Sequence, residues 1–174
     1  MTASMTDTRG ASALRWLWLS LGVVVLDLVS KYLADTQLIY ANPVPLLPVF
    51  DLTLLYNTGA AFSFLATAGG WQRWLFVAIA VGMSAFLLHW MWRTPKAQKC
   101  LGIGLALVLG GALGNLYDRT VHGHVVDFIS LHWNGYYFPA FNIADCAITL
   151  GTCLLLVDMF FLGGNETSDT GTRE

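Results

Sequence analysis

Two aspartates in apolar surroundings are the residues of this chain best suited to chemistry. Asp127 lies in the stretch VVDFI, and Asp145 ends the stretch FNIAD. Neither has a Lys or Arg beside it in the sequence, so a local ion pair explains neither carboxylate. Two carboxylates that face each other titrate apart, so that one stays protonated near neutral pH. One can then take a proton from water while the other gives a proton to a substrate carbonyl, as in a carboxylate-dyad hydrolase.

Two alternatives to a dyad remain open from the spacing alone. Asp145 opens an apolar run, and an Asp in the first turn of a helix complements the helix dipole, so it could be only a helix cap. His122 and His124 form an H-x-H pattern close to Asp127, and a zinc site built from these side chains is conceivable. The chain holds no HExxH motif that would strengthen the metal hypothesis.

Two groups of polar residues lie at helical spacing inside apolar segments. Asp27 and Lys31 are four residues apart, and Asn115, Asp118 and Arg119 stand at i, i+3 and i+4, so each group shares one helix face. An ionisable side chain inside a membrane span costs about 2.5–3.5 kcal/mol. We therefore expect the first group to be a structural ion pair or a contact to substrate or a lipid head group. The second group either holds helices together through polar contacts or belongs to a functional site.

The composition indicates a polytopic membrane protein. Of the 174 residues, 56% are hydrophobic and 11% are charged, whereas a soluble domain has about 25% charged residues. These values exclude a disordered chain and an ordinary soluble enzyme, and a net charge of −2 offers no basic patch for nucleic acid. Three cysteines lie in apolar stretches, and we interpret them as buried small hydrophobes: Cys100, Cys146 and Cys153.

Four segments are apolar enough to cross a bilayer, which takes about 20 residues. They run from about 16 to 33, 74 to 92, 100 to 116 and 143 to 162. The first has basic residues before it, as a signal peptide does, but it continues into Asp27 and Lys31 instead of a cleavage site. We therefore expect an all-α membrane protein with four transmembrane helices over residues 14–162. Residues 1–13 would form a cytoplasmic tail and residues 163–174 a disordered cytoplasmic tail.

The distribution of Lys and Arg predicts the orientation of these spans. The N-terminal tail and the 93–99 connection hold basic residues, whereas the 35–70 and 120–140 connections hold none. The positive-inside rule then places both termini in the cytoplasm and the two long connections outside. Residues 47–55 are rich in Val, Phe, Leu and Thr, with prolines nearby that exclude a helix. They predict a small periplasmic β-strand element.

Five polar stretches, taken together, resemble one family. They are DLVSK (27–31), NTGAAFS (57–63), GGALGNLYDR (110–119), VVDFI (125–129) and FNIAD (141–145). Their order and spacing along residues 14–162 are similar to those of lipoprotein signal peptidase, also called signal peptidase II. Each stretch alone is weak, but five in order on a four-span topology are specific.

The resemblance implies an intramembrane aspartic endopeptidase of the bacterial inner membrane, with its site toward the periplasm. Its substrates would be diacylglyceryl-modified prolipoproteins, cut before the lipidated lipobox cysteine to release the signal peptide. Asp127 and Asp145 would be the catalytic pair, and no metal or cofactor would be needed. The residues that bind substrate or support the pair would be Asn57, Asn115, Arg119 and Asn142, and the structural or supporting ones Asp27, Lys31 and Asp118.

The same resemblance implies how the site is covered. Residues 35–70 would lie on the membrane surface as a β-cradle for the substrate. Residues 120–139 would form a flexible segment that gates entry beside the dyad. Lipid and the lipid-modified substrate are the expected partners, and we expect a monomer.

A rival hypothesis is a small membrane transporter or lipid-binding protein with a proton relay. The relay would use Asp27, Asp118, Asp127 and Asp145. Relay carboxylates are expected near the middle of the membrane, often with a broken helix and an internal repeat. The sequence contains no visible repeat, and its aspartates cluster toward one membrane surface.

Overall fold

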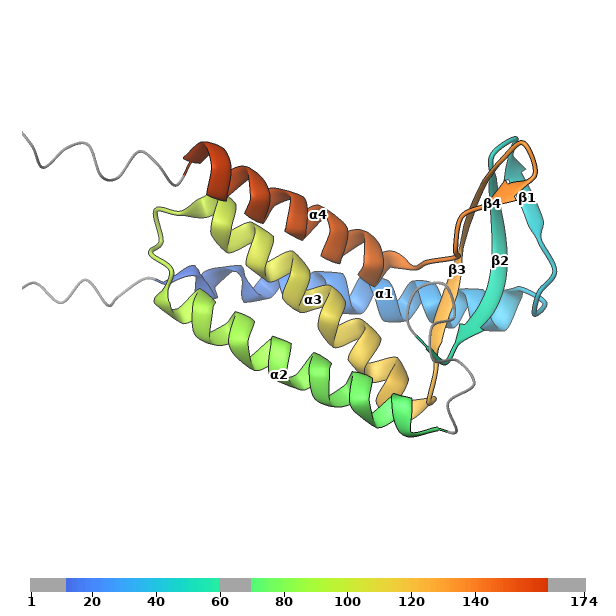
Figure 1. The fold of residues 1–174 in the computed structure, drawn as a ribbon, viewed down its shortest axis with the longest axis horizontal. Helices are drawn as coiled ribbons and strands as arrows, with labels where there is room; N and C mark the ends of the chain where they lie inside the picture. Colours follow the sequence, from blue (N-terminus) through green and yellow to red (C-terminus); the bar gives the residue numbers. More distant parts are fainter. Residues whose placement is uncertain (1–11, 60–69, 163–174) are drawn as a thin grey trace, which may run out of the picture.

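The structure is a computed structural model that describes residues 12–59 and 70–162. In chain order the elements are the 3-10 turn η1 (Ala13–Trp16), α1 (Leu17–Gln37), β1 (Val44–Leu47), β2 (Phe50–Asn57), α2 (Trp71–Arg93), α3 (Lys99–Val121), β3 (Val125–Trp133), β4 (Tyr136–Tyr137), α4 (Ile143–Val157) and the π-helical turn η3 (Asp158–Leu162). The helices lie side by side, and the strands gather at one end of them (Figure 1). Residue 12 and Leu162, at the two ends of the described chain, lie at the opposite end of the bundle.

Within the described residues, four helical segments are long and apolar enough to cross a membrane, which confirms the four expected spans. They are Ala13–Gln37, Trp71–Arg93, Lys99–Val121 and Ile143–Leu162. Helices α1 and α3 extend several residues further toward the sheet than their apolar runs. Polar side chains near these ends bond to the strands: Asp35 accepts from the Tyr56 hydroxyl, and Asp118 accepts from the N–H of Val126. Large apolar side chains are exposed along α1, α2 and α4, as expected of surfaces that face lipid.

Helix α3 is the centre of the bundle. Half of its apolar window is buried, against 11–22% for the other three spans. Glycines on α3 allow this close packing: Gly110 faces Val23 of α1, and Gly111 faces the carbonyl oxygen of Ala144 in α4. Small residues at such contacts let backbones approach closely inside a membrane. The residues at the sheet end of α3 are thereby placed between α1 and α4.

Gly111→Ala is expected to lower the melting temperature and the activity together. The added Cβ would overlap the carbonyl of Ala144 and the side chain of Ile148, and overpacking of this kind costs about 1–3 kcal/mol. Gly82→Ala is the matched control, because its Cβ would meet nothing within 4 Å and Ala favours a helix over Gly by about 1 kcal/mol. Thermal unfolding in detergent checks both variants. Equal melting temperatures would contradict the packing described here.

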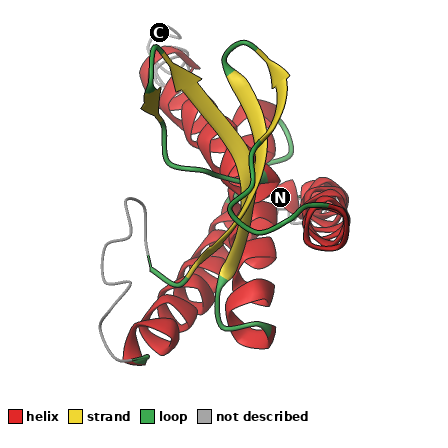
Figure 2. Cartoon of the chain, turned by 90° about the vertical axis from the view of Figure 1, so that its right-hand side faces the viewer, coloured by secondary structure: helices red, strands yellow, loops and turns green. Residues whose placement is uncertain are grey.

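The four strands form one antiparallel sheet in the order β1-β2-β3-β4. Figure 2 shows this sheet across the end of the helices. Leu55 of β2 stands opposite Asp127 of β3, and Asn57 stands opposite Val125, so the two strands bring polar residues together at their bundle end. A bulge interrupts the pairing between Leu52 and Leu55. The small β element expected around residues 47–55 is therefore present, with bounds slightly wider than expected.

Two expectations are wrong. Residues 120–139 are not a flexible gate as a whole, because β3 pairs with both neighbouring strands and buries residues 125–128. The β-branched and aromatic residues of VVDFI favour such a strand. The cysteines are free, as expected, but they are not all buried: Cys100 and Cys146 are half-buried and Cys153 is exposed. Cys153 lies within the fourth span, where an exposed position faces lipid.

Several sequence features lie outside the described residues. They are the two tails at 1–11 and 163–174, and the 60–63 part of the NTGAAFS stretch.

Candidate active site

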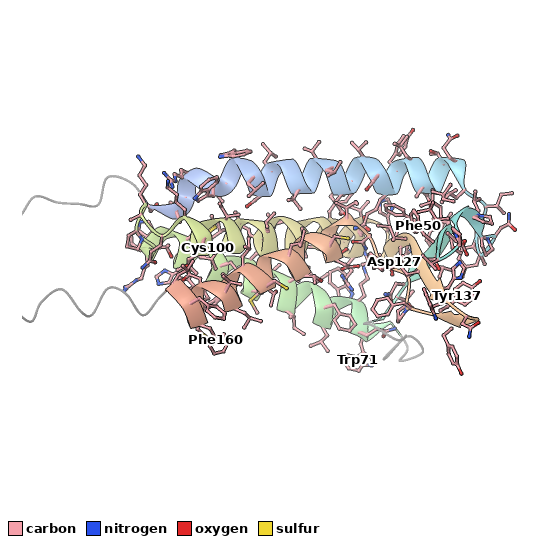
Figure 3. The ribbon with its side chains drawn as sticks, turned by 90° about the horizontal axis from the view of Figure 1, so that it is seen from above. Phe50, Trp71, Cys100, Asp127, Tyr137 and Phe160 are labelled. Atoms are coloured by element: carbon pink, nitrogen blue, oxygen red, sulfur yellow. The ribbon has the colours of Figure 1, made fainter. Side chains whose placement is uncertain are left out.

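Asp127 lies where β3 meets the helices, and Figure 3 shows it at this junction. Its side chain is buried, with 4% of the residue exposed. Oδ1 accepts a hydrogen bond of 2.7 Å from the Asn142 amide, and Oδ2 accepts one of 3.1 Å from the Asn57 amide. Two amide donors therefore hold this carboxylate, one from the start of α4 and one from the end of β2.

Asp145 lies in the first turn of α4. Its Oδ2 accepts from the backbone N–H of Asn142 at 3.3 Å, and its own N–H donates to the Asn142 side-chain oxygen at 3.1 Å. This is a capping box, so the helix-cap interpretation of Asp145 is confirmed. The cap leaves Oδ1 for a different partner, the Asn115 amide, which donates at 2.8 Å. A capping role and a place in a dyad are therefore compatible.

Asn142 and Asn115 connect the two aspartates. The Asn142 amide, which is fully buried, also approaches the Asn115 side-chain oxygen at 3.3 Å. The chain of contacts from Asp127 through Asn142 and Asn115 to Asp145 is thus continuous. The arrangement fixes both carboxylates on rigid elements, as a catalytic pair requires.

Burial, together with the charge of Asp145, raises the pKa of Asp127 to about 6. The amide donors of Asn57 and Asn142 act in the opposite direction, but they do not cancel these effects. A carboxyl with this pKa exchanges a proton near neutral pH, which suits a general acid or base. Because the two aspartates interact, the titration belongs to the pair.

Asp127→Asn is expected to change the pH dependence of stability. The pKa of Asp127 is about 6 in the folded chain, against 3.8 for an Asp side chain in water. Folding is therefore weakened as the pH rises from about 4 through 6, by about 3 kcal/mol at full ionisation. Asn cannot ionise. The melting temperature of the variant should therefore rise relative to that of the wild type as the pH increases from 4 to 7. A difference that stays constant over this range would contradict the raised pKa.

Lys31 is the centre of a second buried network. Its ammonium contacts Asp27 Oδ2 at 2.8 Å and Asp118 Oδ2 at 3.0 Å, and donates to Asn115 Oδ1 at 2.9 Å. Lys31 is 3% exposed. The ion pair expected from the spacing of Asp27 and Lys31 is therefore present, and Asp118 joins it from α3.

The two acids of this network hold the backbone next to Asp127 and next to Asp145. Asp27 Oδ1 accepts from the N–H of Ala144 at 2.8 Å, and Asp118 Oδ2 accepts from the N–H of Val126 at 3.1 Å. Ala144 precedes Asp145, and Val126 precedes Asp127. The network therefore helps to fix the position of both aspartates through the neighbouring backbone, without a bond to either carboxylate.

Arg119 brings a positive charge beside the aspartates. Its guanidinium donates to the carbonyl of Gly59 at 3.3 Å and to that of Asn115 at 3.4 Å, and it lies over the ring of Phe76. With both aspartates it lines a cavity of about 1040 Å³. Most of the other walls are apolar, and they come from β2, β3, the 138–141 segment and α4: Leu55, Leu131, Phe138, Phe141 and Leu150.

The two histidines of the H-x-H pattern lie apart from this cavity's lining. His122 is exposed, and His124 packs against the ring of Tyr56 with 4.4 Å between ring centroids. Burial and the neighbouring His122 lower the pKa of His124. Among residues 12–59 and 70–162, no three His, Cys, Asp or Glu side chains come together as a metal site would require.

Sequence reasoning missed Arg73 of α2. Its guanidinium donates from Nε to the carbonyl of Arg119 and from Nη2 to that of Thr120, both at 2.7 Å. The available signal was its place in the sequence. Arg73 directly precedes the expected second span (74–92), at the end away from the basic residues of the 93–99 connection.

Comparison with known proteins decides the family. A family model described as Signal peptidase (SPase) II matches residues 19–161. The chain belongs to the signal peptidase II family. Two relatives, each named lipoprotein signal peptidase, show how much of the chain is shared. One from Pseudomonas aeruginosa PAO1 is 56% identical over 90% of this chain and 94% of its own length. One from Alteromonas mediterranea is 50% identical over 93% and 89%.

A solved structure supports the fold of this signal peptidase II family member. A bacterial membrane enzyme determined at 2.3 Å resolution superposes with a TM-score of 0.79 and 28% identity, covering 91% of this chain and 94% of that chain. Family membership and the four spans identify this chain as a multi-pass membrane protein of a peptidase family. The family expected from the five polar stretches is therefore confirmed.

Proposed function

We propose that this chain removes signal peptides from diacylglyceryl-modified prolipoproteins by hydrolysing the peptide bond before the lipidated cysteine. The observation that supports this most is the pair Asp127 and Asp145, held by the connected side chains of Asn142 and Asn115 in a largely apolar cavity. The names of the relatives agree with such a substrate. An apolar cavity next to lipid-facing helices suits a substrate whose acyl chains stay in the bilayer.

In the proposed mechanism the two aspartates share one proton at rest. The ionised carboxylate takes a proton from water, and the oxygen of that water attacks the scissile carbonyl carbon. The protonated partner gives its proton to the carbonyl oxygen, forming a neutral tetrahedral diol. The first aspartate then gives its proton to the amide nitrogen as the C–N bond breaks. The second aspartate recovers its proton from the diol hydroxyl, which leaves the acid and amine products.

Arg119 and Asn57 are proposed to orient the substrate backbone, because both line the cavity beside Asp127. Asn115 and Asn142 are proposed to support the dyad through the amide bonds described above. Asp27, Lys31 and Asp118 are proposed to act only through the backbone that they hold.

The proposed location is the bacterial inner membrane, with both termini in the cytoplasm. Arg15, Arg93, Lys96 and Lys99 lie at the end of the bundle opposite the sheet, and Arg15 donates to the Lys96 carbonyl at 3.1 Å. By the positive-inside rule this end faces the cytoplasm. The dyad then lies toward the periplasm, and we propose that a monomer takes its substrate from the lipid there.

The substrate class is tested with a purified prolipoprotein in two forms, with and without the diacylglyceryl group on its cysteine. We expect the wild type to cut the modified form alone, and mass spectrometry to place the cut before the cysteine. Cleavage that persists in the presence of a chelator is also expected. Equal cleavage of both forms, or a cut elsewhere, would overturn the proposal. The rival proton relay would require proton flux into vesicles and no cleavage of either form.

A further inference from the structure

The last turn of α3 carries several residues of the candidate site, and its carbonyl groups need partners. The last four carbonyls of a helix have no partner within the helix. At the end of α3 the Asp118 carbonyl accepts from the N–H groups of His122 and Gly123, at 2.8 and 3.1 Å. Gly123 has φ of +82°, the left-handed conformation that commonly follows a helix end. The carbonyls of Arg119 and Thr120 remain to be satisfied.

Arg73 supplies these partners from another helix. Its Nε and Nη2 donate to the Arg119 and Thr120 carbonyls at 2.7 Å each, a charge-assisted pair of bonds that uses the planar fork of the guanidinium. The third nitrogen, Nη1, lies against Gly123, where an added Cβ would be 3.2 Å away. All three nitrogens of the Arg73 guanidinium therefore lie against residues 119–123 at the end of α3.

The start of α2, which holds Arg73, is itself fixed. Gln72 is 5% exposed, and its side-chain oxygen accepts from the N–H of Gly70 at 2.7 Å. Figure 3 places Trp71 at the same end of the bundle as Asp127. Arg73 can thus hold the last turn of α3 in place through its bonds to the carbonyls of Arg119 and Thr120.

Arg73 is also unusual in its location. Of the seven Lys and Arg residues in the described part of the chain, three belong to the sheet end of the bundle: Lys31, Arg73 and Arg119. Lys31 contacts two carboxylates, and Arg119 lines the cavity. Arg73 contacts the backbone of Arg119 itself, and the Arg119 side chain then reaches across to Gly59.

We propose that Arg73 is a positioning residue for Arg119, keeping its guanidinium directed at Gly59 and the cavity that holds the two aspartates. This inference rests on the substrate-orienting role proposed above for Arg119. Without Arg73, two carbonyls at the end of α3 lose their charge-assisted donors, and the last turn loosens. Arg119 then loses its orientation while the dyad stays in place.

Steady-state kinetics on the diacylglyceryl-modified prolipoprotein test this proposal with Arg73→Gln, Arg73→Lys and the control Arg93→Gln. Arg93 lies at the opposite, exposed end of α2. We expect Arg93→Gln to stay within about twofold of the wild type. Arg73→Gln should lose about tenfold in kcat/KM, mainly through KM, because it disturbs substrate orientation. Arg73→Lys should lie between them, since an ammonium lacks the guanidinium fork.

A double-mutant cycle separates positioning from a general structural role. In an Arg119→Lys background, Arg73→Gln should cost less than about twofold in kcat/KM, because the side chain it positions has been replaced. The same tenfold loss in that background, or no loss in the wild-type background, would overturn the inference. If Arg73→Gln does not purify folded, Arg73→Lys is carried through the same cycle. A wild type that cuts no lipidated substrate would instead reject the proposed function.

Discussion

Asp127→Asn and Asp145→Asn are each expected to reduce cleavage of the lipid-modified prolipoprotein by about 10²–10⁴-fold. Asn has the shape of Asp but cannot pass a proton at either step. Neither substitution removes the helix packing around α3, so both variants should purify as folded proteins. The rate is measured by following release of the signal peptide at a fixed pH, with enzyme in excess if turnover is too slow.

Asp158→Asn is the matched control for this loss. Asp158 begins η3, at the end of the bundle opposite the sheet. The same chemical change there should leave the rate within about twofold of the wild type. A dyad variant that keeps more than a tenth of the wild-type rate would contradict the assignment of that aspartate. Loss in the control as well would indicate a general effect of the substitution.

Lys31→Met is expected to produce the largest loss of stability among single substitutions in the polar networks. Lys31 neutralises Asp27 and Asp118, and all three are buried. Removing one partner from a buried ionic group costs about 3–5 kcal/mol, because charge is left without compensation. Activity should fall as well, since the two acids hold the N–H groups of Ala144 and Val126.

Two further variants identify the cause of that loss. Lys96→Met removes an exposed Lys at the other end of the bundle and should change the melting temperature little. Lys31→Met combined with Asp118→Asn removes one of the uncompensated carboxylates, so it should recover part of the stability. A double variant that is less stable than Lys31→Met would show that lost packing, and not buried charge, dominates.

The spans could be predicted from sequence because membrane insertion depends on local composition. Hydropathy alone locates the four helices, and the Asp27 and Lys31 spacing correctly indicates an ion pair. The extension of α3 to Val121 was not predicted, since its last turn depends on contacts from elsewhere in the chain. Asp118 at that end bonds the N–H of Val126, and Arg73 bonds the carbonyls. Neither contact leaves a signal in a short sequence window.

In the candidate site, too, local features could be predicted from the sequence, and contacts between distant segments could not. The two aspartates stand out because each lies in an apolar stretch, and the five polar stretches are sufficient to indicate the family. The role of β3 was misjudged, because a strand between two others depends on pairing with β2, about 70 residues away in sequence. The contact of Asn142 with Asp127 depends in turn on where β3 places Asp127 relative to the start of α4.

The pH dependence of kcat/KM on the lipid-modified substrate tests the central claim, that Asp127 and Asp145 act together as the catalytic pair. A pair that shares one proton is active between its two macroscopic pKa values, so the profile should be bell-shaped. Because the pKa of Asp127 is raised to about 6, we expect the rate to fall on the alkaline side with an apparent pKa near that value. A profile that is flat from pH 4 to pH 8, or that rises to a plateau above pH 8, would contradict the shared-proton dyad.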